Sequence, residues 1–259
     1  MRTSKVLSKF RNGKLAKICS AGHLLPFYIR HAAHHNYDGI WLDLEHRTMD
    51  NREVQTFISA CHHNDIDCMV RTPTTTRTHL YHLLEDGATG LMIPFVSSEI
   101  TARQIVEATK FPPLGNRGVD GAGLDNDYYV GTSKKNEDYY ADANRETFIV
   151  AQIETLEAFE NLEAIASVKG IDCLFVGPAD MGLRLKTSNS KFTLKDVNAR
   201  VASVAKHHGL AWGTTAGSVE DLVRHRELGA QIIPWGSDFS LINILKACSA
   251  DLDSVAHLK

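Results

Sequence analysis

The sequence predicts a single (β/α)8 barrel, and three observations support this fold class. The chain has 259 residues, and barrels of this type are about 250 residues long. Eight short apolar runs recur along it, each continuous rather than alternating, as expected of strands buried on both faces of a parallel sheet. Amphipathic stretches separate the runs, which indicates helices between successive strands. We therefore expect one domain over residues 1–259.

The eight runs are the predicted strands. In chain order they are Leu15–Cys19, Gly39–Leu44, Asp67–Arg71, Gly90–Ile93, Phe148–Ile153, Asp172–Val176, Leu210–Gly213 and Gln231–Pro234. The alternative is an open doubly wound sheet, which often has a G-x-G-x-x-G turn after its first strand. No such turn follows Cys19, so the barrel is favoured.

Helix signals lie between these strands. Residues 50–53 (DNRE) and 218–221 (SVED) resemble capping boxes, and apolar residues at every third position predict a helix over 155–167. Glycines at the ends of three helical stretches supply left-handed caps; they are Gly87, Gly209 and Gly229. The connection from Phe111 to Asn144 is too long for a simple repeat, and a loop of that length is usually functional.

Composition excludes several classes of protein. The net charge is −3, from 28 basic and 31 acidic residues, whereas nucleic-acid-binding proteins usually carry an excess of basic residues on one face. The longest apolar runs, such as 90–96, are far shorter than a membrane span, and the N-terminus lacks an apolar signal core. Five cysteines without a C-x-x-C pair indicate reduced thiols, so we expect a cytoplasmic protein that binds neither nucleic acid nor membrane.

Ionisable residues gather where the predicted strands end, which is where barrels place their reactive groups. Glu154 and Asp180 follow strands five and six, and two carboxylates at one mouth suit Mg²⁺ or Mn²⁺. The structural alternative for Asp180 is a helix cap. Arg71 ends strand three and would bind an anionic substrate oxygen, or else pair with Asp43 or Glu45.

His46 follows two acids, and an imidazole held by a carboxylate is the usual general base near neutral pH. The other twelve histidines fall mostly in helical stretches. His31 and His35 have a spacing that can bind zinc, but no acidic or cysteine ligand accompanies them. We interpret that group as solvent-exposed surface.

Six sequence pieces, in this order, carry a resemblance to a known family. They are DGIWLDLEH (38–46), VRTP (70–73), Gly87-Ala88 to Ile93-Pro94, FPPLGNRG (111–118), QIET (152–155) and Gly170 through VGPAD (176–180). The sequence resembles the metal-dependent pyruvate aldolases of the HpcH/HpaI superfamily over about residues 15–240.

This resemblance implies a lyase that cleaves a 4-hydroxy-2-oxo acid to pyruvate and an aldehyde through a metal-stabilised enolate. It implies Glu154 and Asp180 as metal ligands, Arg71 beside the enolate oxygen, and His46 as acid/base, supported by Asp43 or Glu45. The expected substrate-binding residues are Gln152, Gly177, Pro178, Ala179, Asp180, Arg117 and Trp235. The family is typically hexameric with exchanged C-terminal helices, and the apolar stretch 239–247 is compatible with such a helix.

Three departures from the family pattern lie where the second substrate should bind. They are Ala21-Gly22-His23 after strand one, residues 119–125 (VDGAGLD), and Met181 to Lys186 after the aspartate. The electrophile therefore stays open between an aldehyde and a thioester. The first alternative function is a synthase that condenses oxaloacetate with acetyl-CoA, possibly without a metal. The second is a non-catalytic module that binds a 2-oxo acid or a metal.

Overall fold

The computed structural model describes residues 2–130 and 139–257, and their core is a curled parallel sheet. Seven strands pair in chain order, so each strand lies beside the next one in the sequence. They are β1 (Ile18–Ala21), β2 (Gly39–Asp43), β3 (Asp67–Arg71), β4 (Gly90–Ile93), β5 (Phe148–Ile153), β6 (Cys173–Val176) and β7 (Ala211–Thr214). The first seven predicted strands are confirmed, with bounds shifted by up to three residues.

The eighth predicted strand, 231–234, forms isolated bridges rather than a strand. Ile232 bridges both Ala16 and Gly213, and Trp235 N–H donates to Ile18 O at 2.8 Å. Pro234 lacks an N–H and Gly236 has a left-handed φ of 95°, so a regular ladder cannot continue through this segment. The segment still joins β7 to β1, and the fold is TIM-barrel-like.

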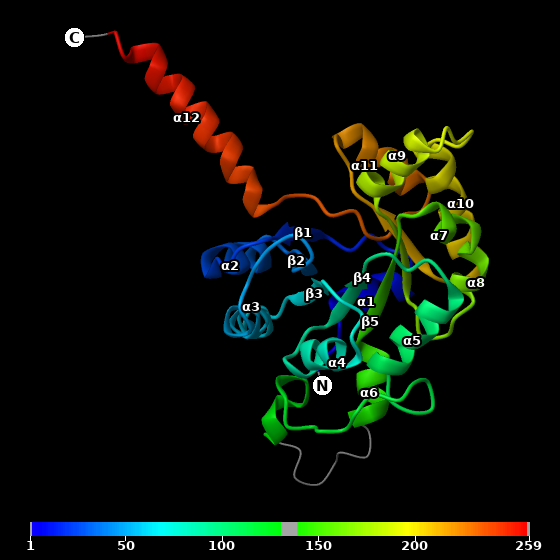
Figure 1. Ribbon diagram of the computed structural model, residues 1–259. Helices are drawn as coiled ribbons and strands as arrows, with labels where there is room; N and C mark the ends of the chain where they lie inside the picture. Colours follow the sequence, from blue (N-terminus) through cyan, green and yellow to red (C-terminus); the bar gives the residue numbers. More distant parts are fainter. Residues whose placement is uncertain (1, 131–138, 258–259) are drawn as a thin grey trace.

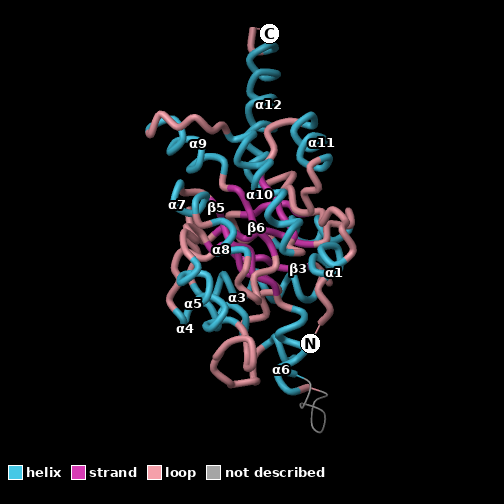
Figure 2. The backbone as a smooth tube through the Cα atoms, turned by 90° about the vertical axis from the view of Figure 1, so that its right-hand side faces the viewer, coloured by secondary structure: helices cyan, strands magenta, loops and turns pink. Residues whose placement is uncertain are grey.

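Helices surround the strands, which occupy the centre in Figure 2. The helices are α1 (Lys5–Arg11), α2 (Pro26–His34), α3 (Asn51–His63), α4 (Arg77–Glu85), α5 (Glu99–Thr109), α6 (Tyr139–Glu146), α7 (Leu156–Glu160), α8 (Leu162–Ala166), α9 (Pro178–Thr187), α10 (Leu194–His208), α11 (Val219–Glu227) and α12 (Leu241–Val255). Two 3-10 turns, η1 (Leu124–Tyr129) and η3 (Asp238–Ser240), accompany them.

The helix signals are largely confirmed. The box at Asp50 is reciprocal, and Gly87, Gly209 and Gly229 all have positive φ. Ser218 caps α11, but the carboxylate of Asp221 accepts from Gly217 N–H instead of closing a box. The predicted helix over 155–167 is wrong as a single element. It breaks at Asn161, whose side chain donates to Ser97 O at 2.9 Å, and forms α7 and α8.

Alternation along the strands separates two buried layers. Trp41, Met69, Val150 and Phe175 belong to the layer inside the barrel, whereas their strand neighbours pack outward against the helices. The same inner rows continue two residues later, at the carboxyl ends of the strands, into polar residues. These are Asp43 on β2, Arg71 on β3 and Gln152 on β5. We call this end of the barrel the mouth.

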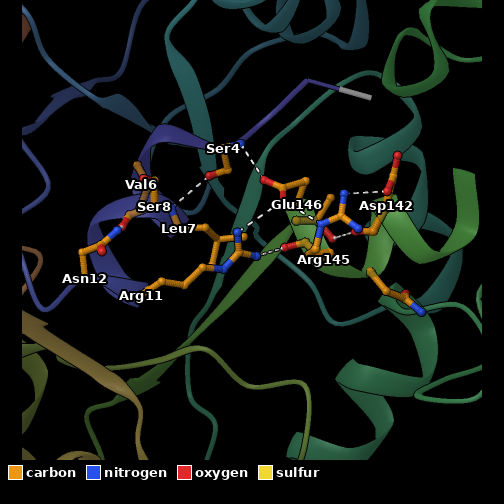
Figure 3. A network of polar contacts seen from close by, with 12 residues as sticks. Ser4, Val6, Leu7, Ser8, Arg11, Asn12, Asp142, Arg145 and Glu146 are labelled. Atoms are coloured by element: carbon orange, nitrogen blue, oxygen red, sulfur yellow. Dashed lines mark hydrogen bonds and ion pairs between the residues drawn. The ribbon is translucent and has the colours of Figure 1, made fainter. Parts of the chain in front are cut away.

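The opposite end is closed by α1, whose Val6 and Leu7 are buried inside the barrel. Buried Asp67 accepts hydrogen bonds from Ser4 Oγ at 2.7 Å and Val6 N–H at 2.9 Å, and it pairs with Arg2. Figure 3 shows the neighbouring network, in which Glu146 of α6 accepts from Ser4 N–H and Arg11. These contacts hold the N-terminus in place as a plug.

Helix α12 points away from the rest of the chain in Figure 1. None of its residues is buried, although it carries Leu241, Ile242, Leu245 and Leu252. Its exchange between subunits stays a prediction, because the structure contains one chain. Within the described residues, no helix is both long enough and apolar enough to cross a membrane.

Candidate active site

Arg71 is the most tightly held charge at the mouth. Its Nε and Nη2 bond the two carboxylate oxygens of Asp43 at 3.0 and 2.9 Å, and its Nη1 lies 3.0 Å from Glu45 Oε2. The guanidinium stacks over Trp41, 4.8 Å from the ring centroid. Burial alone would raise the pKa of Asp43, but the hydrogen bonds and charge of Arg71 outweigh it and lower that pKa. Both structural partners proposed for Arg71 are therefore real, and they fix its orientation.

His46 lies beside this cluster on the solvent side. Its Nε2 is 3.6 Å from Glu45 Oε2, and its side chain is 57% exposed. Asp43 Oδ1 accepts the backbone N–H groups of Glu45 and His46, at 3.1 and 3.4 Å, and so shapes the turn after β2. The carboxylate facing the imidazole is thus Glu45, while Asp43 holds Arg71.

Glu154 is buried at the end of β5. Its Oε1 accepts Phe95 N–H at 2.9 Å and its Oε2 accepts Gln152 Nε2 at 2.8 Å. Burial, together with the negative charges of Glu45 and Asp180, raises the pKa of Glu154 to about 7. The Phe95 amide was not found from the sequence. It reaches Glu154 because Phe95 adopts φ 53°, a strained conformation that its residue type does not reveal.

The turn from β6 into α9 lies against Glu154. A Cβ on Gly177 would lie 2.3 Å from Glu154 Oε2, so glycine is required there for steric reasons. Of the predicted substrate-binding residues 177–180, not all have a backbone N–H that is available to a substrate. Gly177 N–H donates to Ile153 O at 3.2 Å, and Pro178 has no N–H. Ala179 and Asp180 remain as first-turn amides without an intrahelical acceptor.

Asp180 sits in the first turn of α9. Its Oδ1 pairs with Arg184 Nη1 at 2.5 Å, and the Arg184 guanidinium packs 5.4 Å from the Phe95 ring centroid. Asp180 follows β6 and Glu154 follows the adjacent strand β5, so both carboxylates lie at the mouth. The negative charge of Asp180 contributes to the raised pKa of Glu154. Arg184 is therefore part of the mouth, although the sequence showed only that it lies nearby.

Two predicted substrate-binding residues, Arg117 and Trp235, are not part of the cluster around Arg71 and Glu154. Arg117 forms a fully buried ion pair with Asp125 at 2.8 Å, and Asp125 lines a small cavity with Thr89 and Thr147, before β4 and β5. That is the end of the barrel opposite the mouth, so Arg117 does not reach the mouth of its own chain, and its role in substrate binding stays a prediction. Trp235 is 40% exposed in the segment that closes the barrel, and its carbonyl accepts from Tyr37.

The donor set fits a divalent cation held by few protein ligands. No three His, Cys, Asp or Glu side chains form a metal-binding group within residues 2–130 and 139–257, so a closed site is not present there. Glu154 and Asp180 are two hard oxygen ligands, and Mg²⁺ is usually held by one or two carboxylates together with water and substrate. The pKa of Glu154 is raised mainly by burial, and the negative charges of Glu45 and Asp180 add to the shift; a cation would compensate these charges.

Comparison with known proteins agrees with this geometry. The family model for HpcH/HpaI aldolase/citrate lyase matches residues 24–243. The chain belongs to this family. It is 32% identical to the hydroxypyruvate/pyruvate aldolase of Paraburkholderia phytofirmans, over 80% of each chain. It is 33% identical to the 5-keto-4-deoxy-D-glucarate aldolase of Shigella boydii, over 79% of each.

The fold is also that of a solved family member. The HpcH/HpaI aldolase from Desulfitobacterium hafniense superimposes with a TM-score of 0.84 at 28% identity, covering 98% of this chain and 97% of that one. With relatives of this kind along most of its length, the chain is an HpcH/HpaI-type lyase with an aldolase function, acting on small molecules. The aldolase prediction is confirmed at this level.

Proposed function

We propose that this lyase is a divalent-metal-dependent aldolase that cleaves a 4-hydroxy-2-oxo acid to pyruvate, or a related 2-oxo acid, and an aldehyde. The observation that carries the proposal is the meeting of Glu154, Asp180 and the Arg71 cluster at one mouth. The aldolase names of the relatives at 32% and 33% identity favour this reaction over condensation with acetyl-CoA.

Glu154 and Asp180 would hold Mg²⁺ or Mn²⁺, which when bound polarises the keto oxygen as a Lewis acid. Gln152 Nε2 keeps Glu154 oriented, while Gln152 Oε1 is buried without a partner and is free to accept from a ligand. The amides of Ala179 and Asp180, at the positive end of α9, would bind the substrate carboxylate. Arg184 would have to release Asp180 Oδ1 for the ion.

The bond that breaks joins C3 and C4 of the substrate. A base removes the proton of the C4 hydroxyl, the C3–C4 electron pair moves into an enolate, and the C4 fragment leaves as an aldehyde. His46, facing Glu45, is placed to take that proton and later return it to C3 of the enolate. Arg71, held by Asp43, presents a fixed positive charge where the enolate oxygen develops.

A pyruvate-release assay over a panel of 4-hydroxy-2-oxo acids tests the proposal. We expect turnover that stops in excess chelator and returns with Mg²⁺ or Mn²⁺. A parallel assay of thiol release from acetyl-CoA with oxaloacetate tests the synthase. Full activity in chelator, or thiol release without aldol cleavage, would contradict the metal-dependent aldolase.

The protein would act as a homo-oligomer in the cytoplasm. Leu241, Ile242 and Leu245 of α12 are exposed in one chain, and a neighbouring subunit would cover them. All five cysteines are free thiols, as expected in a reducing compartment. Light scattering on the full chain should give a multiple of the 28.7 kDa chain mass, with a hexamer expected. A variant that ends at residue 240 should form an assembly with fewer subunits. An assembly with the same number of subunits would refute a role for α12.

A further inference from the structure

The β1 side of the mouth carries a cluster that the proposed mechanism does not use. Gly22 continues the inner row of β1, two residues beyond Ser20. A Cβ on Gly22 would lie 2.8 Å from Arg47 Cγ and 3.1 Å from the Phe239 ring. The side chains of Arg47 and Phe239 therefore cover this side of the mouth. Arg47 is also the residue directly after His46.

Arg47 is a cation that two contacts hold in place. Its guanidinium lies 4.6 Å from the Phe239 ring centroid, and its Nη1 donates to His46 O at 2.6 Å. The other two arginines of the mouth, Arg71 and Arg184, are paired with carboxylates. In the described part of the chain, Arg47 takes part in no ion pair. Stacking fixes the plane of the guanidinium and leaves most of its N–H donors for another acceptor.

Neighbouring residues hold this cluster in place. Asp238, whose side chain is 1% exposed, accepts Gly22 N–H and His23 Nδ1, both at 2.9 Å. The His23 ring lies 5.1 Å from Phe239, on which Arg47 also packs. A buried carboxylate thus ties the turn after β1 to η3, so that the ring supporting Arg47 is fixed from two sides.

Arg47 also borders a cavity. This cavity of about 520 Å³ lies between α3 and α4. Thr48, Asn51 and Gln55 line it, and so do Glu85 and Asp86. An arginine fork that is fixed on an aromatic ring beside a catalytic mouth has the chemistry of a receptor for carboxylate or phosphate.

We propose that Arg47 determines specificity by binding an anionic group, a carboxylate or a phosphate, at the far end of the aldehyde. Phe239 and the His23–Asp238 pair are positioning residues for it. The proposal rests on the aldolase function proposed above. It assigns a role to one of the segments in which this chain departs from the family pattern, the Gly22-His23 turn.

Condensation of pyruvate with matched aldehydes tests this role. Succinic semialdehyde is compared with butyraldehyde, and glyceraldehyde 3-phosphate with glyceraldehyde, as the ratio of kcat/KM for the charged and neutral member. We expect Arg47→Gln to lower at least one ratio by about tenfold, the size of a lost charge-assisted hydrogen bond. The pair that responds identifies carboxylate or phosphate. Gly22→Ala, which keeps the charge but displaces Arg47, should change the same ratio.

Arg30→Gln, an exposed arginine on α2, is the control and should leave both ratios unchanged. Ratios unchanged by Arg47→Gln would overturn the proposal. Binding of succinate and of inorganic phosphate, measured by calorimetry with Mg²⁺ and saturating pyruvate, is independent of turnover. Arg47→Gln should weaken one of them about tenfold. No binding by the wild type, or equal binding by the variant, would refute the role of Arg47. If the wild type condenses no aldehyde, the proposed aldolase function fails. The calorimetric binding of succinate and phosphate then decides by itself whether Arg47 binds an anion.

Discussion

Replacing Glu154 by Gln should stabilise the metal-free protein at alkaline pH. Burial and the nearby carboxylates raise the pKa of Glu154 to about 7, against 4.5 for an ordinary glutamate. The charged form is therefore disfavoured in the folded chain. Its cost is absent below pH 4.5, grows as the pH rises, and is complete above pH 7. The full difference corresponds to about 3 kcal/mol.

Because the mouth is open to solvent, which screens charges, we expect Glu154→Gln to raise the free energy of unfolding at alkaline pH by about 1 to 3 kcal/mol. Hydrogen bonds should survive the substitution. Gln152 Oε1 now lacks a partner, and a flip of the Gln152 amide would let it accept from the new amide nitrogen, while the Glu154→Gln carbonyl still accepts Phe95 N–H.

Urea unfolding of both proteins in chelator, at equal protein concentration, measures the effect. The free energy of unfolding of the variant should exceed that of the wild type at pH 8, and the two free energies should become equal near pH 5. Mg²⁺ should stabilise the wild type at pH 8, by about 2.7 kcal/mol at one hundred times its dissociation constant, and the variant much less. A variant that is no more stable at pH 8, or a gap that does not shrink toward pH 5, would refute the reasoning.

Three further predictions follow from the same contacts. Gly177→Ala should weaken Mn²⁺ binding, measured by electron paramagnetic resonance, by at least about tenfold, since its Cβ would meet Glu154 Oε2 at 2.3 Å; Gly182→Ala, whose Cβ meets nothing closer than 3.4 Å, should not. Arg71→Lys should lower kcat by about tenfold or more with little change in KM, because lysine cannot keep the two-pronged contact with Asp43; a change confined to KM would contradict this. Burial raises the pKa of Asp67 to about 6, so the wild type should gain stability as the pH falls from 6 to 4, and Asp67→Asn should lose that gain; an equal pH dependence in both proteins would refute it.

Much of the candidate site could be predicted because its residues follow strands that the sequence marks clearly. The runs 67–71, 90–93 and 148–153 are continuous and apolar, and all three match the observed strands. In a parallel barrel, every strand delivers its carboxyl end to the same side. Arg71 and Glu154 could thus be placed at one mouth from their positions alone.

Other features depended on contacts between distant segments. Arg117 has the same charge as Arg71, but the connection buries it against Asp125 at the other end of the barrel. Three contacts depend on how loops fold over the mouth: the Arg184 ion pair with Asp180, the Phe95 amide on Glu154 and the stacking of Arg47 on Phe239. Loops lack the periodicity that identifies strands and helices.

The sequence by itself determined the fold class, the order of the strands and the end of the barrel that carries chemistry. These follow from hydrophobic periodicity and from the handed, sequential pairing of parallel strands, both of which are local rules. Only the tertiary structure decided which charges meet and which are left over. Pairing at 3 Å depends on where a whole loop comes to rest, and no local pattern encodes that position. Three outcomes of that kind are Glu45 facing His46, the raised pKa of Glu154, and Arg47 stacked on Phe239 with no ion pair to any described residue.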